Sequence, residues 1–200
     1  MTHVLQLNNS IFGDQGQSSQ LASRFLQRIK TTDTEVSVTE RDLVQSPVPH
    51  LTGTRFQAGL TAPEARTEQQ AQEAKLADTV IEELEAADVL LITAPVYNFN
   101  ITSTLKAWFD HVARAGRTFQ YTETGPQGLL RDKTAYVFIT SGGQYADTDL
   151  DFQAPYIKHM LGFIGITDVH IIRAEGLAMG DQAINDALAT AHQSIARLVA

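Results

Sequence analysis

The chain has 200 residues, of which 43% are hydrophobic and 19% are charged, so it can build a substantial core within one domain. Its formal net charge of −8 argues against nucleic acid or an anionic membrane surface as a partner, because both require basic patches. There is no cysteine for disulfides or metal centres, no basic and apolar leader and no apolar run near ~18 residues, so we expect a cytoplasmic protein that does not enter a membrane.

In chain order, short apolar segments alternate with helical patterns. Residues 3–7 are predicted to form the first strand, and apolar residues at helical spacing over 21–29 predict the helix that follows. Residues 35–42 alternate as a second strand, and residues 43–62, rich in Pro, Gly and Thr, are predicted to be a loop. Residues 61–64 (TAPE) match a capping box with proline in the first turn, which predicts that a polar helix begins there.

The second half of the chain continues the alternation. Strands are predicted over residues 88–94, 134–140 and 168–174. Helices are predicted over residues 105–112, 152–164 and 184–198, the last of them capped by Asp181.

Five strands that alternate with helices predict an α/β fold. The continuous apolar runs at residues 89–92 and 136–139 indicate strands that are buried on both faces, which is typical of a parallel sheet with helices on both sides. Ligands in such folds bind outside the carboxyl ends of the strands. The loops after the first, third and fourth strands are therefore the places where a site is expected.

The first of these loops, residues 8–19, joins a strand to a helix. Free backbone N–H groups at the helix start, together with Ser10, Gly16, Gln17 and Ser18, can form an anion site. The loop has neither a dinucleotide glycine fingerprint nor a nucleotide-hydrolase motif, and it lacks lysine and arginine. These features favour a small terminal phosphate, although the same residues also fit a polar loop with a serine helix cap.

The second loop, APVYNFNIT, begins at Ala94. Pro95 supplies a turn residue, Tyr97 and Phe99 are flat, and the Asn98 amide offers both a donor and an acceptor, which matches the mixed edge of a pyrimidine-like ring. Packing of the two aromatic residues against the next helix is the alternative. The backbone from Pro95 through Val96 to Phe99 is predicted to border a planar ligand.

The third loop contains Ser141, Gly142 and Gly143. Paired glycines after a strand permit unusual φ values and close backbone approach to a ligand, although an ordinary tight turn has the same composition. Taken together, the three loops offer a phosphate cradle, an amide beside a planar ring and a glycine wall at one edge of a sheet. Flavin mononucleotide (FMN) is the leading candidate, and the fold that binds it in this way is a doubly wound sheet with strand order 2-1-3-4-5.

Three segments resemble the FMN-dependent NADH-azoreductases, relatives of the quinone reductases: LNNSIFGDQGQSSQL, APVYNFNITSTLKAWFDHVARAGRTFQYTETGPQGL and LGFIGITDVHIIRAEG. The resemblance implies one flavodoxin-like FMN-binding domain over residues 1–200 and a homodimer with FMN in each subunit. It also implies that NADH or NADPH reduces quinones and azo compounds. By position, Ser10 and residues 16–18 would bind the phosphate, residues 96–99 would border the isoalloxazine ring, and residues 141–143 would close its other side. The loop TSGGQYADTD and residues 45–62 depart from the family pattern, so the natural substrate stays open.

The expected mechanism needs no catalytic residue, because the flavin carries the redox chemistry. A nicotinamide is expected to deliver hydride to flavin N5 and leave before the acceptor enters, which predicts ping-pong kinetics, and Asn98 is expected to tune the ring. The alternatives are a flavodoxin-type electron carrier without small-molecule turnover and a regulatory protein that keeps the fold.

Three further sets of residues are candidates for a functional role. Residues 113–130 are longer than a simple connection, so Tyr121 and Phe163 are candidates for a substrate pocket, with helix packing as the alternative for Phe163. The aspartates at 147, 149 and 151 begin like a calcium loop, but the later positions fail the pattern and helix capping explains them better. His111 is interpreted as a half-buried structural residue, and no metal is predicted.

Overall fold

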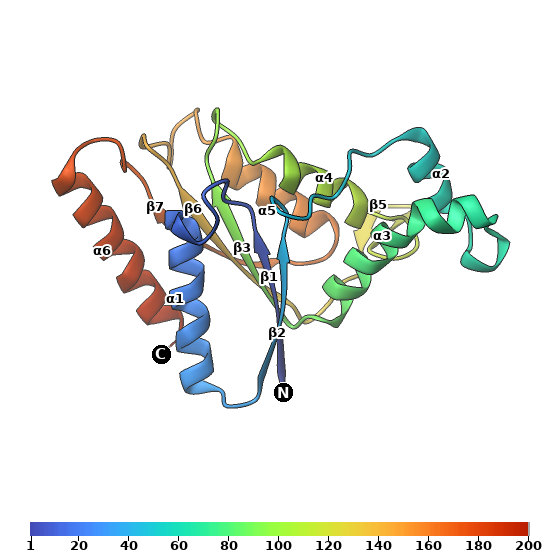
Figure 1. Ribbon diagram of the computed structural model, residues 1–200, viewed down its shortest axis with the longest axis horizontal. Coiled ribbons are helices and arrows are strands. Elements are labelled where there is room, and N and C mark those ends of the chain that lie inside the picture. The colour runs from blue at the N-terminus through green and yellow to red at the C-terminus, as the bar shows by residue number, and fades with distance from the viewer. Residues whose placement is uncertain (200) are drawn as a thin grey trace.

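A parallel sheet of five strands forms the centre of the protein, in the order β2-β1-β3-β6-β7 (Figure 1). The computed structural model describes residues 1–199. The strands are β1 (Thr2–Asn8), β2 (Val36–Asp42), β3 (Val89–Pro95), β6 (Thr134–Thr140) and β7 (Asp168–Ala174). Neighbouring strands pair in parallel throughout. Counted within this sheet, the order is the predicted 2-1-3-4-5, so the predicted fold class is confirmed.

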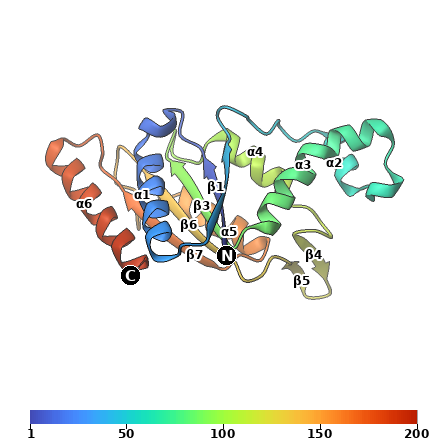
Figure 2. The ribbon, with the colours of Figure 1, turned by 60° about the horizontal axis from the view of Figure 1, so that its bottom comes forward.

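Helices cover both faces of the sheet (Figure 2). They are α1 (Gln17–Thr32), α2 (Gly53–Leu60), α3 (Glu68–Ala86), α4 (Ser103–Val112), α5 (Gln153–Phe163) and α6 (Asp181–Leu198). On β3, Leu91 packs in one apolar cluster with α1 and α6, while Leu90 and Ile92 pack in another with α3, α4 and α5. Successive strand residues point to opposite faces, so burial of both faces explains the continuous apolar run. No helix within residues 1–199 combines the length and the apolarity needed to cross a bilayer.

The segment between β2 and α3 differs from the prediction. Residues 43–62 are not all loop, because α2 lies within them, and the capping box predicted at residues 61–64 is wrong. Pro63–Ala65 is a short 3-10 turn without a side-chain cap. The capping box is formed instead by Thr67 and Gln70, whose side chains each bond the other's backbone N–H, and α3 begins there.

A cluster of charges anchors this segment. Asp78 on α3 accepts hydrogen bonds from Arg66 at 2.6 Å and from Arg114, two side chains that are only 6% and 8% exposed. Burial by itself raises the pKa of Asp78, but the hydrogen bonds from the two guanidinium groups outweigh burial and hold that pKa below its usual value. Arg66 also donates to the carbonyl oxygens of Ala58 and Thr61, so one buried ion cluster fixes the end of α2 on α3.

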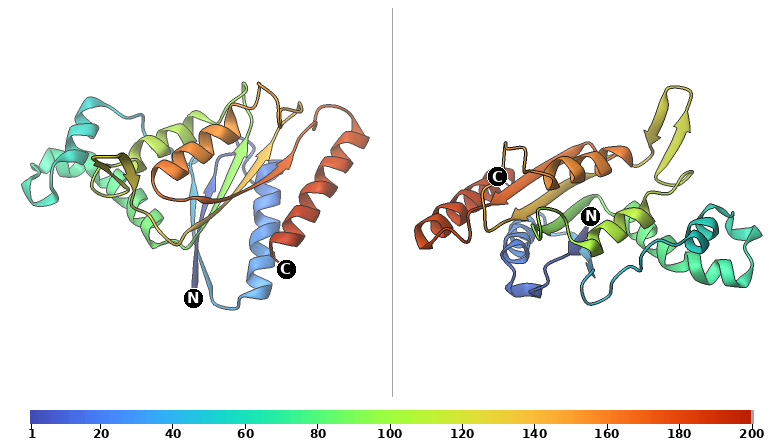
Figure 3. Two further views of the ribbon diagram at one scale, coloured as in Figure 1. Left: turned by 180° about the vertical axis from the view of Figure 1, so that it is seen from behind. Right: turned by 90° about the horizontal axis from the view of Figure 1, so that it is seen from above.

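The predicted insertion at residues 113–130 contains an antiparallel hairpin of β4 (Phe119–Thr122) and β5 (Gly125–Gly128). The hairpin stands out from the body of the molecule (Figure 3, right). Its base is held because the Phe119 ring lies 4.4 Å from that of Phe163, centroid to centroid. Its outer half is solvated, and Tyr121 is 75% exposed.

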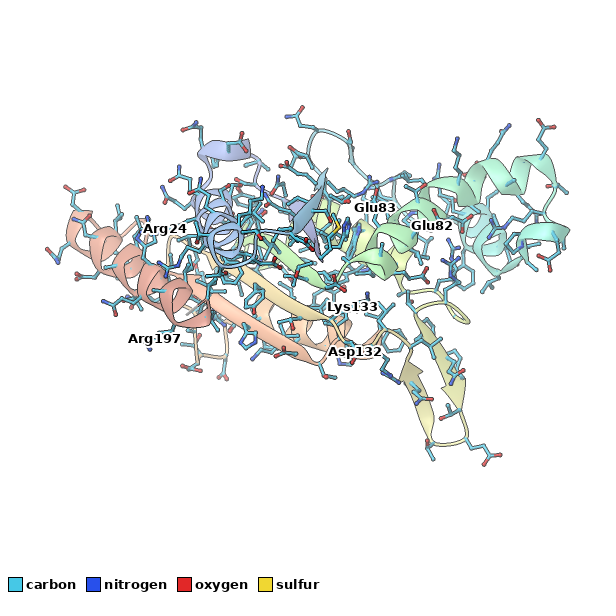
Figure 4. All side chains as sticks on the ribbon, turned by 90° about the horizontal axis from the view of Figure 1, so that it is seen from below. Arg24, Glu82, Glu83, Asp132, Lys133 and Arg197 are labelled. Carbon is cyan, nitrogen blue, oxygen red and sulfur yellow. The ribbon has the colours of Figure 1, made fainter. Side chains whose placement is uncertain are left out.

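Lys133 lies at the amino end of β6, where the strands of the sheet begin (Figure 4). Its ammonium group donates to the carbonyl oxygens of Glu85 and Ala87, at 2.8 and 2.5 Å, and so provides hydrogen bonds to free carbonyl groups at the end of α3.

At the start of α6, the predicted cap by Asp181 is wrong, since Gly180 at φ 99° occupies the cap position and no side chain caps the helix. Asp181 lies in the first turn, where its charge favours the helix dipole.

Candidate functional site

The three predicted loops meet in one cleft of about 200 Å³ at the carboxyl edge of the sheet. The order in which successive strands are added to the sheet reverses there, between β1 and β3, which is where doubly wound sheets bind their ligands. The predicted residues that line the cleft are Ser10, Gly16, Gln17, Ser18, Pro95, Val96, Tyr97, Ser141 and Gly142. Asn98, Phe99 and Gly143 lie on the same loops but outside the cleft lining.

The first loop is fixed by Asn9, a residue that the sequence analysis did not select. Asn9 is fully buried; its backbone N–H donates to Thr93 Oγ1 at 2.7 Å and its Nδ2 donates to the Thr93 carbonyl oxygen at 2.9 Å. The signal in the sequence is a threonine at the end of the apolar run of β3, together with an asparagine directly after the last residue of β1. This contact holds the loop in place before the helix begins.

Ser10, Gly16 and Ser18 form a cradle at the start of α1. The Ser10 hydroxyl accepts from the N–H of Phe12 at 3.2 Å, and a Cβ added to Gly16 would lie 2.0 Å from it, so only glycine fits. No side chain caps α1, which leaves N–H groups of its first turn directed toward the cleft. The Ser18 hydroxyl is buried and has no hydrogen-bond partner within residues 1–199. An anion such as phosphate would satisfy these donors.

The second loop is a tight turn. Tyr97 and Asn100 exchange two backbone hydrogen bonds of 3.2 Å, and the central residues, Asn98 and Phe99, have φ values of 50° and 66°. Positive φ at both central positions is typical of a type I′ turn, in which asparagine and glycine are favoured. Asn98 and Phe99 are therefore exposed at the tip of the turn, while Tyr97 remains in the cleft.

The third loop forms one wall of the cleft, although not by the predicted backbone freedom. Neither Gly142 nor Gly143 has a positive φ, so that part of the prediction is wrong. Their value is steric: a Cβ on Gly142 would lie 3.2 Å from the Ala178 side chain, and one on Gly143 would lie 2.8 Å from the Tyr145 hydroxyl. The N–H groups of Gly176 and Ala178 donate to the carbonyl oxygens of Gly143 and Gly142.

Four further residues contribute to the cleft and were missed from the sequence. Phe12, Thr140 and Leu177 line it. Gln153, 2% exposed at the start of α5, donates from Nε2 to the Pro95 carbonyl oxygen at 3.3 Å, while its Oε1 is buried without a partner within residues 1–199. Gln153 thus ties α5 to the loop that follows β3, and no short-range pattern in the sequence indicates that contact.

These features fit FMN. The unpartnered Ser18 hydroxyl, the uncapped α1 and the Gly16 cradle suit a phosphate held by neutral donors, and Pro95 to Tyr97 line the cleft together with Ser141 and Gly142. Tyr97 is the one ionisable side chain among the lining residues. The cleft can therefore bind a phosphate attached to a planar ring, but its lining offers no carboxylate or imidazole for acid or base catalysis.

Tyr121 and Phe163 are not brought into this cleft. Tyr121 lines a separate apolar hollow of about 300 Å³, together with Leu51, Phe56 and Leu60 from the α2 region. Phe163 packs against the main apolar cluster and against Phe119. The hollow lies beside α2 and the hairpin, away from the strand ends where a ligand is expected in this fold.

The remaining candidates have structural roles. Asp151 Oδ1 accepts from the N–H of Ala154 at 3.1 Å, which confirms helix capping for that aspartate. His111 is buried more deeply than predicted, its Nε2 lies 2.9 Å from the Pro49 carbonyl oxygen, and burial lowers its pKa. Within residues 1–199, no three His, Cys, Asp or Glu side chains gather in a way that could hold a metal ion.

Comparison with known proteins agrees with this architecture. The chain is 47% identical over 198 residues to an FMN-dependent NADH:quinone oxidoreductase of Alteromonas mediterranea, covering 99% of this chain and 98% of the relative. It is 48% identical over 198 residues to the protein of that name from Cellvibrio japonicus, covering 98% of this chain and 100% of the relative.

Solved structures give the same result. A crystal structure of an azoreductase from Bacillus anthracis has a TM-score of 0.89 at 27% identity, covering 100% of this chain and 99% of its own. An FMN-dependent NADH-azoreductase from the same species, solved in complex with FMN, has a TM-score of 0.85 at 26% identity, with 100% of both chains covered. The flavodoxin-like fold family matches residues 2–199. The chain therefore belongs to the family of proteins with the flavodoxin-like fold.

Proposed function

We propose that this protein is an FMN-dependent oxidoreductase that uses NADH to reduce quinones and azo compounds. The observation that carries the proposal is the convergence of three loops on one cleft whose buried Ser18 hydroxyl has no partner within residues 1–199. The names of the relatives and of the structural neighbours support the cofactor, the donor and the two acceptor classes. In this proposal the chain acts as one FMN-binding domain in the cytoplasm.

Ser10, Gln17 and Ser18, with the first-turn N–H groups of α1, would hold the phosphate, and Pro95 to Phe99 with Ser141 to Gly143 would hold the ring. When bound, FMN supplies the hydride-transfer chemistry. The protein positions both substrates in turn against one face of the cleft, which Tyr97 and Phe12 help to line. Because the lining residues include no carboxylate or imidazole, protons come from water.

Asn98 has a separate part in this proposal. It lies at the exposed tip of a backbone-bonded turn, so its amide can turn toward a ring without breaking the turn. A donor at that position stabilises negative charge on the pyrimidine edge and favours reduction.

We also propose that the active form is a homodimer. Within one copy, Tyr121 lies on a projecting hairpin and cannot reach the cleft with the three loops (Figure 3, right). Its predicted role as a pocket residue is met if the hairpin of one copy covers the cleft of the other. The exposed side chains of Phe56, Leu60 and Tyr121 provide apolar surface for that contact.

The test is turnover by the purified protein. We expect a yellow protein whose released cofactor is FMN by chromatography and mass, and which oxidises NADH when a quinone or an azo dye is present. Because one cleft serves both substrates, double-reciprocal plots at several fixed acceptor concentrations are expected to be parallel. Flavin reduction that is followed by electron transfer to a protein partner alone would instead support the electron-carrier function.

A further inference from the structure

The loop that follows the glycine wall, residues 144–151, is held by a small network of charges. Arg173, near the end of the edge strand β7, pairs through one nitrogen with Asp151 at 2.5 Å and through another with Glu175 at 3.1 Å. The carboxylate of Glu175 accepts from the backbone N–H groups of Tyr145 and Ala146 at 3.4 and 3.2 Å. Asp151 also caps α5. Glu175 is therefore the residue that joins this network to the early part of the loop.

Tyr145 is the side chain that this attachment places. Its hydroxyl lies over Gly143, where a Cβ would be only 2.8 Å away, so the ring folds back across the glycine wall. On its other side the Tyr145 ring packs against Phe99, with the ring centroids 5.6 Å apart. Phe99 is the exposed tip of the turn after β3. The two rings thus join the second and third loops beside the cleft.

The anchoring of α5 and β7 has other contacts besides the one between Glu175 and the loop. Asp151 also pairs with Arg173 and caps α5, and β7 is paired with β6 along its length. What the two hydrogen bonds to Tyr145 and Ala146 fix is the path of the loop, and hence the position of the Tyr145 ring. The carboxylate is thus suited to a positioning role.

We infer that Glu175 is a positioning residue that determines which acceptors reach the cleft. It does so by holding Tyr145 against Phe99, so that the two rings form the outer wall of the cleft. The inference rests on the proposed function, since it concerns selectivity between acceptors. With Glu175 in place, the two rings narrow the approach and disfavour bulky azo compounds relative to small quinones. Without it, the loop relaxes, Tyr145 leaves Phe99 and the discrimination weakens.

The first experiment measures the loop and does not depend on turnover. Amide hydrogen exchange of the FMN-loaded protein is followed by mass spectrometry for peptides that contain residues 144–147 and for peptides of β6. Glu175→Ala is expected to speed exchange in the loop roughly tenfold or more, because two hydrogen bonds to a charged group are lost, while β6 stays unchanged. Glu175→Gln, which keeps one acceptor oxygen, is expected to show a loop exchange rate between those of the wild type and Glu175→Ala. Unchanged loop exchange in both variants overturns the inference.

Glu83→Ala is the matched control. Glu83, on α3 (Figure 4), pairs with Arg41 through two bonds of 2.5 and 2.6 Å, so its loss also removes a two-bond carboxylate contact, but away from the three loops. It is expected to leave exchange in residues 144–147 unchanged.

The second experiment compares kcat/KM for a small benzoquinone with kcat/KM for a bulky azo dye. The ratio is expected to fall about three- to tenfold in Glu175→Ala and in Tyr145→Ala, with FMN affinity within about twofold of wild type, and to stay constant in Glu83→Ala. Tyr145→Phe, which keeps the ring, is expected to retain the wild-type ratio. If exchange rises in Glu175→Ala but the ratio does not change, or if Tyr145→Ala leaves it unchanged, the inference is wrong. A wild-type protein without turnover refutes the proposed function instead, while the exchange result still decides whether Glu175 holds the loop.

Discussion

Replacement of Ser18 by alanine is expected to weaken FMN binding without weakening the apo fold. The Ser18 hydroxyl is buried and has no partner within residues 1–199, so its removal breaks no hydrogen bond of the protein. A buried hydroxyl without a partner costs about 1–3 kcal/mol, so the apo variant is expected to unfold at the wild-type temperature or a few degrees above it. With FMN, the variant loses one hydrogen bond to a charged phosphate, about 1.5–3 kcal/mol, or roughly ten- to a hundredfold in Kd.

The assay is a fluorescence titration of the apo protein with FMN and with riboflavin, which lacks the phosphate, together with a thermal melt. Riboflavin affinity is expected to change by less than about twofold, because Ser18 contacts no part of that ligand in this proposal. Ser23→Ala, at an exposed position of the same helix, is the control and is expected to change neither affinity. Equal losses for FMN and riboflavin, or a lower melting temperature of the apo variant, would show that Ser18 supports the fold and not the phosphate.

Three other predictions follow from the same geometry. Asn98→Ala is expected to slow flavin reduction by NADH about tenfold in stopped-flow absorbance without abolishing it, because one donor to the ring is lost and no acid or base; complete inactivity with FMN bound would contradict a tuning role. Asp78→Asn is expected to lower the free energy of unfolding at pH 7 by about 3 kcal/mol in urea titrations, because the buried side chains of Arg66 and Arg114 lose their charged partner. The pKa of Asp78 in the folded protein is lowered, so this stabilisation is present above the usual carboxyl pKa of about 3.9 and is lost as the pH falls through the folded value. The difference in free energy of unfolding between variant and wild type is therefore expected to be smaller at pH 3 than at pH 7. An equal difference at both pH values would contradict the argument. Light scattering at low micromolar concentration is expected to give a dimer mass that Tyr121→Ala reduces toward the monomer, whereas a wild-type monomer would exclude a shared pocket.

The strands and the edge that carries the site could be predicted from the sequence because both depend on short-range patterns. Apolar runs such as residues 89–92 identify buried strands, and parallel pairing brings the loops after β1, β3 and β6 to one edge whatever the packing details are. The cleft residues Ser10, Ser18 and Tyr97 could be found for the same reason.

The parts that could not be predicted depend on contacts between distant residues. α2 is a short helix with an internal glycine, so its own sequence predicts it poorly. It is held on α3 by hydrogen bonds from Arg66 to its last turn, and no local pattern in the sequence indicates these bonds. The sequence from Thr61 to Gln70 contains two matches to a capping box, and only the structure shows that the second begins the helix. Asn9 and Gln153 act through partners 84 and 58 residues away.

The tight turn after β3 has a consequence for attempts to engineer this protein. Phe99 adopts a φ of 66°, a region that costs a non-glycine residue about 1 kcal/mol relative to glycine, and the preceding asparagine already suits the turn. Any selection for heat resistance would therefore favour Phe99→Gly, which gives the Asn-Gly pair that such turns prefer. The same change would remove the ring against which Tyr145 packs. A gain in thermostability at this side chain would therefore come with weaker control over which acceptors enter the cleft. Stabilised variants should be screened for acceptor range as well as melting temperature.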